Sequence, residues 1–261
     1  AMVDGCLEKG LDLTRGGAHY NSTGVQLMGF ANVVDSLYSV KKAVFEDKLF
    51  TMADLAQWLS EDWQDAEDKR AYFLNRIPKY GNDNDEVDAL GVRVMDHYCD
   101  VLSGYRNFRG GFFWPGVFSV GFHITMGAFT GATPDGRFAG DVLGNGITPT
   151  TGNAVSGPTA IMNSVVKLPV TRATNGVNLN MRFQGKKIRT EHLAALIQTY
   201  FRNGGTQVQF NMVDSEVLRD AQQHPEKHRD LFVRVSGYSA EFVGLSEIAQ
   251  DEIISRTEFE I

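Results

Sequence analysis

The chain has 261 residues, of which 43% are hydrophobic, and this is enough to bury one large core or two smaller ones. Its formal net charge of −7 and its lack of a basic block give little support to nucleic-acid binding. No apolar run approaches the length of a membrane span, no signal peptide is visible, and the two cysteines are far apart in sequence. The composition therefore predicts a cytoplasmic protein without a disulfide framework.

A short motif near the start, Gly5-Cys6-Leu7-Glu8, precedes the first predicted element. A cysteine with a carboxylate two residues on is a weak motif by itself, because a buried structural cysteine is the usual alternative. The segment from Lys9 to Thr23 is rich in glycine and polar residues, and we expect it to form a loop.

Three amphipathic helices are predicted in the first half of the chain. Asn32 is the expected N-cap of the first, whose inward stripe comprises Val33, Val34, Leu37, Val40 and Val44. Thr51 is the expected cap of the second, with Asp54 as the acid of a capping box and with Leu55, Trp58 and Leu59 inward. The charged residues 61–70 are expected to form a solvated helix face. The third helix turns inward Val87, Leu90, Val94 and Tyr98, with Cys99 packed in the core.

Glycine and aromatic residues dominate the middle of the chain. Residues 112–122 are too interrupted for a helix and suit a strand with its entry loop. Thr133-Pro-Asp-Gly-Arg137 predicts a turn, because proline presets φ and a glycine follows the aspartate. Residues 152–167 combine small residues with a short apolar helix or strand.

Helix and strand signals then alternate, which indicates the α/β class. Residues 173–183 alternate as in a strand, Thr190 is the expected cap of a helix, residues 207–211 form another strand, and Asp214 opens a further helix. The stretch 231–245 predicts a strand over 231–235, a turn at Gly237 and a second strand over 239–243. His224 and His228 have the spacing of a helical metal pair, but the proline between them favours a solvated helix junction, and we predict no metal site.

Considered together, these motifs resemble those of the glycyl radical enzyme family, which includes pyruvate formate-lyase. The resemblance runs through essentially the whole chain and rests on Gly5-Cys6-Leu7-Glu8, Tyr20-Asn21-x-Thr23-Gly24, Thr133-Pro134-Asp135-Gly136-Arg137, Gly157-Pro158-Thr159-Ala160, Gln207-Val-Gln209-Phe-Asn211 and Arg234-Val-Ser-Gly237-Tyr238. It implies that the chain is the carboxyl-terminal portion of a longer enzyme and supplies the second half of a ten-stranded α/β barrel. Residues 1–170 would be the carboxyl-terminal half of the catalytic barrel, with the cysteine loop at its start, and residues 171–261 the glycyl radical domain.

The resemblance also implies a role for each end of the chain. The glycine matching Gly237 stores an unpaired electron at Cα, and the cysteine matching Cys6 exchanges a hydrogen atom with it before attacking the substrate. Arg234, Ser236 and Tyr238 would support the radical loop. No tightly bound cofactor is implied, and a radical S-adenosylmethionine activating enzyme would install the radical, because nothing here matches an iron–sulfur site. The family is commonly dimeric, which implies a homodimer.

Glu8 separates the expected reaction from that of pyruvate formate-lyase, which uses two adjacent cysteines. Glu8 matches the pattern of the dehydratases, C–N and C–S lyases and arylacetate decarboxylases, where it would act as a base for a substrate hydroxyl. The expected reaction is thiyl-initiated C–H abstraction followed by elimination from a small hydroxylated substrate. Two alternatives stay open: an arylacetate decarboxylase, for which Phe112, Phe113 and Trp114 would line the pocket, and a radical-bearing module that needs a partner chain.

The residues after Glu8 depart from the glycerol-type dehydratases. A His-Asp pair is expected there, and its absence argues against glycerol or propanediol as the substrate. His19 and Asp12 are the nearest polar side chains that would replace the pair. Asp141 stands where many relatives carry a glutamate, and it is a third candidate for the substrate pocket.

Overall fold

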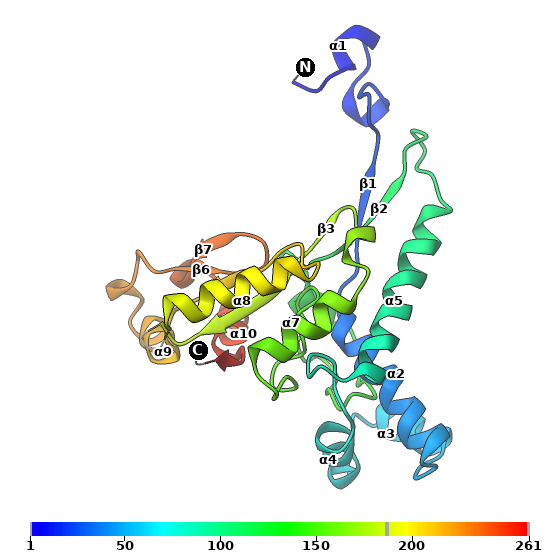
Figure 1. Ribbon diagram of the computed structural model, residues 1–261, viewed down its shortest axis with the longest axis vertical. Coiled ribbons are helices and arrows are strands. Elements are labelled where there is room, and N and C mark those ends of the chain that lie inside the picture. The colour runs from blue at the N-terminus through cyan, green and yellow to red at the C-terminus, as the bar shows by residue number, and fades with distance from the viewer. Residues whose placement is uncertain (1, 186–187, 260–261) are drawn as a thin grey trace.

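The computed structural model describes residues 2–185 and 188–259, and it combines helices with short parallel strands (Figure 1). The helices are α1 (Cys6–Lys9), α2 (Phe30–Val40), α3 (Met52–Ser60), α4 (Glu67–Asn75), α5 (Asp85–Ser103), α6 (Phe122–Ala128), α7 (Pro158–Lys167), α8 (Thr190–Arg202), α9 (Ser215–Gln223) and α10 (Glu247–Ser255). The strands are β1 (Thr23–Gln26), β2 (Phe113–Val117), β3 (Gly176–Val177), β4 (Asn180–Phe183), β5 (Gln209–Asn211), β6 (Phe232–Arg234), β7 (Ser239–Glu241) and β8 (Glu258–Phe259).

Two small parallel sheets and one hairpin organise these strands. In the first sheet β2 lies between β1 and β3, with Thr23 opposite Phe113. In the second, β4 lies between β5 and β8, with Asn180 opposite Gln209. Parallel neighbours need long crossover connections, and the helices supply them. β6 and β7 form an antiparallel hairpin around Gly237, as the sequence predicted.

The strand predicted over residues 173–183 is divided between the two parallel sheets. β3 ends at Val177 and β4 begins at Asn180, and every residue of β4 is buried. Parallel strands that are covered on both faces have no solvent side, so the observed burial does not alternate. The two residues between β3 and β4 therefore carry the chain from one sheet to the other.

The first predicted helix is present, but its start differs from the prediction. α2 begins at Phe30, after Gly29 with a left-handed φ of 72°, so Asn32 lies inside the helix and is not its cap. Asn32 instead donates to the carboxylate of Asp135 (2.7 Å) and accepts from the backbone N–H of Gly144 (2.7 Å). From the sequence alone, an asparagine that is buried and hydrogen-bonded cannot be distinguished from an asparagine that caps a helix.

The inward face of α2 also differs from the predicted stripe. Val33 and Leu37 are exposed, and the residues that are buried are Phe30, Ala31, Asn32, Val34, Asp35, Tyr38 and Ser39. Of the predicted stripe, Val34 is buried and Val40 and Val44 pack against the core. Val33 and Leu37 lie outside the buried face, because adjacent residues point about 100° apart on a helix. The buried face includes polar residues, which a count of apolar positions overlooks.

Two other helix predictions are confirmed. Thr51 accepts from the backbone N–H of Asp54 (3.1 Å), and the Asp54 carboxylate accepts from the backbone N–H of Thr51 (3.0 Å), which is the capping box of α3. On α5, Val87 and Cys99 are buried in the hydrophobic core. The free thiol of Cys99 is thus part of the packing.

The charged segment 61–70 is a tight turn that leads into α4, and not one solvated helix face. Asp62, Trp63 and Asp65 have positive φ angles. Trp63 is almost completely buried, and its indole N–H donates to the carbonyl of Arg137 (3.3 Å). Burial of one large aromatic ring fixes this turn, although most of its neighbours in sequence are charged.

Smaller differences concern the boundaries of elements. β2 covers only the first part of the strand predicted over 112–122, and α6, which was not predicted, follows it. α8 begins at Thr190 with Arg189 as its N-cap, so Thr190 is the first helical residue and not the cap. The prediction for residues 152–167 left helix and strand open, and α7 is a helix.

Two hydrophobic clusters lie beneath these elements. The larger one extends from α2 to α8, and the smaller one consists of Leu218, Ala221, Val233, Val235, Phe242 and Ile253. Figure 1 shows that α1 lies at the end of an arm formed by β1 and β2, away from both α2 and the hairpin. Among the described residues, no helix is long and apolar enough to cross a bilayer.

Candidate functional site

The predicted radical loop is the tip of the hairpin between β6 and β7. The backbone N–H of Val235 donates to the carbonyl of Tyr238 (2.9 Å), so residues 235–238 form a tight turn. Gly237 has a φ of 86°, in the left-handed region that glycine adopts without strain. Gly237 and Tyr238 are exposed, whereas Ser236 is buried. The Cα of the glycine is therefore accessible, while the residue before it is fixed in the interior.

One glutamine on β5 binds the loop from the side. Oε1 of Gln209 accepts from the backbone N–H of Gly237 (3.2 Å) and from Nε (3.2 Å) and Nη2 (2.9 Å) of Arg234. The side-chain amide of Gln209 donates to Asn178 (3.4 Å) and to Asn180. Gln209 is buried, and partners at both ends of its amide fix its orientation. Arg234 thus reaches the loop glycine through a shared acceptor.

A second set of side chains holds the loop at Ser236. Its hydroxyl donates to Oδ1 of Asn145 (2.7 Å) and lies 3.0 Å from Oγ of Ser119. Oγ of Ser119 is 2.8 Å from Oδ1 of Asn145 and 2.8 Å from Nδ1 of His123. Nδ2 of Asn145 donates to the carbonyl of Val235 (3.3 Å). All these side chains are buried, where polar contacts are stronger than they are in water.

An ion pair at the end of α10 completes the anchorage of the loop. Arg256 donates to the carbonyls of Arg234 (3.0 Å) and Val235 (2.7 Å), and it binds the Glu252 carboxylate (2.7 Å). Oε1 of Glu252 also lies 3.5 Å from Nε2 of His123. Burial acts to raise the pKa of Glu252, but Arg256 and His123 lower it to about 2. Glu252 is therefore a carboxylate at neutral pH.

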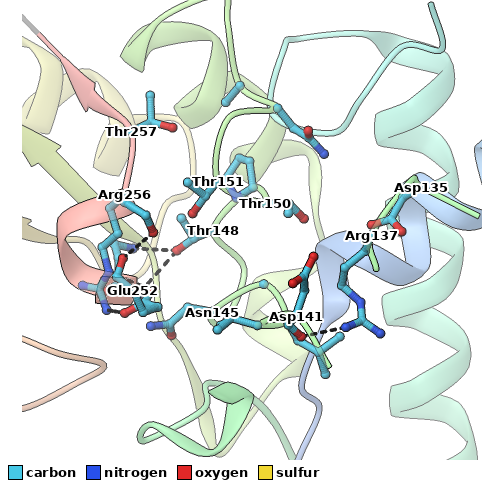
Figure 2. Close-up of a pocket in the computed structure, with 18 of the residues that line it drawn as sticks. Asp135, Arg137, Asp141, Asn145, Thr148, Thr150, Thr151, Glu252, Arg256 and Thr257 are labelled. Atoms are coloured by element: carbon cyan, nitrogen blue, oxygen red, sulfur yellow. Dashed lines mark hydrogen bonds and ion pairs between the residues drawn. The ribbon is translucent and has the colours of Figure 1, made fainter. Parts of the chain in front are cut away.

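A cavity of about 350 Å³ lies beside this ion pair (Figure 2). Figure 2 shows Glu252 and Arg256 on one side of the cavity and Asp135, Arg137 and Asp141 on the other. Its volume is at the lower end of the range for small-molecule sites. Asp141, predicted as a pocket carboxylate, is therefore part of a cavity wall, and its role in binding stays a prediction.

The predicted turn at residues 133–137 forms part of this wall. The Arg137 guanidinium donates to the carbonyls of Asp141 (2.6 Å) and Thr130 (3.1 Å), so it connects the segment before the turn with the loop after it. Gly136 has a φ of 96°, and a Cβ added there would lie 2.7 Å from the side chain of Leu74. Both the backbone conformation and the close approach therefore require glycine at this position.

Cys6, Glu8 and His19 lie together in the small lobe at the end of the arm. Cys6 is buried, and a Cβ added to Gly17 would lie only 3.0 Å from its Sγ. Nε2 of His19 is 3.4 Å from Oε2 of Glu8, and both side chains are largely exposed. Asp12 accepts from a backbone N–H and caps the short turn that follows it. The structure thus places two pocket candidates near the cysteine, one of them beside Glu8.

The structure does not bring the cysteine lobe to the glycine hairpin. In Figure 1, α1, which carries Cys6, is at the far end of the arm from β6 and β7, which flank Gly237. A hydrogen atom cannot pass directly between Cys6 and Gly237 in this arrangement. The catalytic roles of Cys6, Glu8 and Gly237 stay predictions.

Most of the side chains that anchor the loop were not identified from the sequence. They are Ser119, His123, Asn145, Asn178, Glu252 and Arg256. One signal was available, because Glu252 and Arg256 are opposite charges four residues apart on a helix. The others carry no signal, since a polar residue that is buried and paired cannot be distinguished by type from an exposed one.

An acidic cluster elsewhere is held together by a lysine. Within residues 2–185 and 188–259, Asp83, Asp85 and Asp88 form the one acidic group with metal-ligand spacing. The ammonium of Lys167 already lies among them, at 2.7, 2.7 and 2.8 Å from the three carboxylates. The cluster is therefore an ion-pair network whose centre is occupied by the Lys167 ammonium, which offsets one of the three negative charges.

Two family models match the chain: "Pyruvate formate lyase-like" over residues 1–127 and "Glycine radical" over residues 143–243. The chain is 41% identical to the probable dehydratase YbiW of Escherichia coli (strain K12), with 99% of the chain and 34% of that protein aligned. It is 38% identical to the trans-4-hydroxy-L-proline dehydratase of Clostridioides difficile, with 98% of the chain and 33% of that protein aligned.

Among solved structures, the glycerol-bound B12-independent glycerol dehydratase from Clostridium butyricum matches the whole chain with a TM-score of 0.95 and 44% identity. The match covers 34% of that protein, so the chain spans about a third of the length of its relatives and corresponds to their carboxyl-terminal portion. The TM-score and the sequence identity together confirm the predicted fold class.

Proposed function

The chain belongs to the glycyl radical enzyme family, and we propose that it carries the radical glycine and the reactive cysteine of an enzyme that performs radical elimination. Gly237 stores the radical, Cys6 transfers the hydrogen atom and Glu8 acts as the base. The observation that carries the proposal is the hairpin tip, where an accessible glycine with left-handed φ is bound through its N–H to buried Gln209. We further propose that residues 1–170 belong to the catalytic barrel and residues 171–261 to the radical domain.

The environment of Gly237 supports its role as a radical store. A radical at Cα becomes planar, and glycine alone lacks a side chain that opposes this change. The exposed tip also leaves the Cα hydrogen within reach of a partner. A radical S-adenosylmethionine activating enzyme would be that partner, since a glycyl radical has to be formed on the intact chain by another protein. A homodimer is the expected assembly.

The proposed reaction is balanced in atoms and electrons. The thiyl of Cys6 takes a hydrogen atom from a substrate carbon that bears a hydroxyl, and Glu8 takes the hydroxyl proton. The bond from the neighbouring carbon to its hydroxyl, amino or sulfonate group then breaks, and the group leaves with the bonding electron pair. Glu8 returns its proton to the leaving group, which departs as water, an amine or hydrogen sulfite, and the Glu8 carboxylate is restored. The product radical takes its hydrogen atom back from the thiol of Cys6, so the thiyl is restored.

The distance between the cysteine lobe and the hairpin counts against a direct transfer between Cys6 and Gly237, because the whole chain already matches a glycerol-bound dehydratase with a TM-score of 0.95. The chain aligns with about a third of each relative, so each relative has about twice as many residues outside the aligned part as within it. We propose that such residues cover the cysteine lobe in the whole protein. Four exposed apolar residues of the lobe, Leu7, Leu11, Leu13 and Tyr20, support this proposal, since apolar side chains that gather on one surface often mark a contact site.

The pocket candidates concern the position of Glu8 and the contacts with the substrate. His19 lies beside Glu8, and we propose that it holds the carboxylate in position toward a substrate hydroxyl. Asp12 and Asp141 remain weaker candidates for substrate contacts. The missing His-Asp pair still argues against glycerol or propanediol.

A decarboxylase of an arylacetate is a second candidate. Phe112 and Trp114 are exposed on and beside β2, which pairs with β1 in the arm that carries Cys6. An aromatic substrate would find partners there. A third possibility is that the chain acts as a radical-bearing module together with a separate partner chain.

The first test is anaerobic electron paramagnetic resonance of the whole protein that contains this chain, co-expressed with its activating enzyme. We expect a doublet that is absent in Gly237→Ala. This variant is a clean control, because an added Cβ would meet only Nδ2 of Asn178, at 3.5 Å, and the left-handed φ costs about 1 kcal/mol.

Dioxygen supplies a second readout. Exposure to air after activation is expected to cut the chain at Gly237, and the fragment is identified by mass spectrometry. An unactivated sample is the control and should stay intact. A protein that shows neither doublet nor cleavage with a competent activating enzyme would refute the proposed function.

A further inference from the structure

We propose that His123 is a positioning residue for the radical loop: with Ser119 and Glu252 it fixes Val235 and Ser236, the two residues before Gly237. The inference rests on the proposed function, because it gives these residues a purpose only if Gly237 carries a radical. It assigns a role to a buried histidine that lies on α6, outside the hairpin and outside the cysteine lobe.

The contacts form a closed ring of side chains and backbone. From His123 the ring runs through Ser119 (2.8 Å) to Asn145 (2.8 Å), whose side chain binds the hydroxyl of Ser236 (2.7 Å) and the carbonyl of Val235 (3.3 Å). From there it returns through Arg256 (2.7 Å) and Glu252 (2.7 Å) to His123 (3.5 Å). The loop is thus held between α6 and α10, two helices that are far apart in sequence.

The number of hydrogens in the ring determines which atom of His123 donates. Nδ2 of Asn145 donates to the backbone, so its Oδ1 faces both serines and accepts from both hydroxyls (2.8 and 2.7 Å). Ser119 has a single hydroxyl hydrogen, which this contact uses. Its remaining 2.8 Å contact with His123 therefore requires an N–H on Nδ1 of the histidine.

The other ring nitrogen of His123 is also informative. Nε2 is buried without a hydrogen-bond partner among the described residues, and it faces the Glu252 carboxylate at 3.5 Å. Glu252 is bound more closely by Arg256, and Arg256 binds the backbone of the loop. His123 thus bonds to Ser119 and lies beside the carboxylate that binds Arg256, so both anchors of the loop adjoin one side chain.

Hydrogen–deuterium exchange of the unactivated whole protein tests the positioning without any radical. We expect His123→Ala and Ser119→Ala to speed exchange in the peptide over residues 231–242 by about tenfold, the effect of losing a buried hydrogen bond. His123→Asn keeps a donor near the position of Nδ1 and is expected to restore slow exchange. The exposed His97 on α5 provides the matched control, His97→Ala, with exchange as in the wild type.

The lifetime of the radical supplies the functional readout. After anaerobic activation, the doublet of His123→Ala is expected to decay about tenfold faster than that of the wild type, and that of His123→Asn at nearly the wild-type rate. Unchanged exchange of the loop in folded His123→Ala and Ser119→Ala would overturn the proposal. Equal acceleration of all peptides would also overturn it, since the residues would then support only the fold.

The two proposals fail in different ways. A wild-type protein that gives no doublet refutes the proposed function, whatever the exchange of its variants. The exchange measurement needs no radical, so it decides by itself whether His123 positions the loop.

Discussion

Replacement of Asp35 by asparagine tests whether the interior of the larger core holds a neutral carboxyl group. Asp35 on α2 is completely buried and accepts from the backbone N–H of Tyr80 (2.7 Å) and from Asn153 (3.0 Å). Burial raises the pKa of Asp35 to about 7, although the nearby Lys79 acts in the opposite direction. Between pH 3.8 and about 7, the folded chain therefore keeps a proton on Asp35 that the unfolded chain releases.

The sign of the effect follows from this difference. The stabilisation by Asp35 is fully present below its unfolded pKa of 3.8, and it is lost as the pH rises through about 7. The shift of roughly 3 pKa units corresponds to about 4 kcal/mol over the whole range, of which about 3 kcal/mol falls between pH 5 and pH 8. Asparagine is nearly the same shape and does not titrate, so Asp35→Asn should lack this loss.

Urea unfolding of the wild type and Asp35→Asn at pH 5 and pH 8 measures the difference directly. We expect the free energy of unfolding of the wild type to fall by about 3 kcal/mol relative to the variant as the pH rises. Asp230→Asn, at an exposed position, is the control and should follow the wild type. Parallel curves for the wild type and Asp35→Asn would refute the reasoning, because they would mean that Asp35 is already ionised in the folded chain.

Three further substitutions probe other parts of the structure. Folding lowers the pKa of Glu252 from 4.5 to about 2, so its contribution to stability is present above pH 4.5 and is lost as the pH falls. Glu252→Gln should therefore lose about 2 kcal/mol less free energy of unfolding than the wild type between pH 6 and pH 3, measured by urea unfolding. Thr51→Ala should cost about 1 kcal/mol of thermal stability through the lost capping box, and Thr51→Ser should cost little. Gln209→Leu leaves Arg234 and the N–H of Gly237 without their acceptor and should cost about 2 kcal/mol in urea unfolding, whereas equal stability of Gln209→Leu and Gln209→Glu would contradict the bonding described.

Much of the local structure was visible in the sequence. Thr51 and Asp54 combine two residue types at one spacing, and this combination before an apolar helical stripe is typical of a capping box. The hairpin around Gly237 was equally clear, because two β-branched or aromatic runs enclose a glycine. Predictions of this kind succeed because the interactions that cause the structure lie within a few residues of one another.

The errors have the opposite origin. The local pattern predicts a cap at Asn32, but its true partners, Asp135 and Gly144, are distant in sequence and meet it only in the folded chain. Trp63 fixes a turn through a core that lies outside its own segment. His123 and Ser119 carry no local pattern at all, since their contacts with the loop join α6 to residues far along the chain.

The family resemblance supplied what local patterns could not. Cys6 and Gly237 are at opposite ends of the chain, and nothing in their immediate surroundings connects them. The motifs between them predicted the fold class, which the structural neighbours confirm. The sequence does not identify the substrate, because specificity depends on pocket contacts that come from many segments.

The topology of the second sheet has a consequence for how the chain is made. β4 can pair with β5 and β8 only after both have been synthesised, and β8 follows α8, β5, α9 and the whole hairpin in the chain. Contacts between such distant segments form slowly, because a long stretch of chain has to be ordered first. On the ribosome, the hairpin with Gly237 therefore emerges before Glu252 and Arg256 exist to anchor it. A chain that is released before Arg256 would present this glycine on an unanchored loop, so the contacts that hold the proposed radical site form only after α10 has been made.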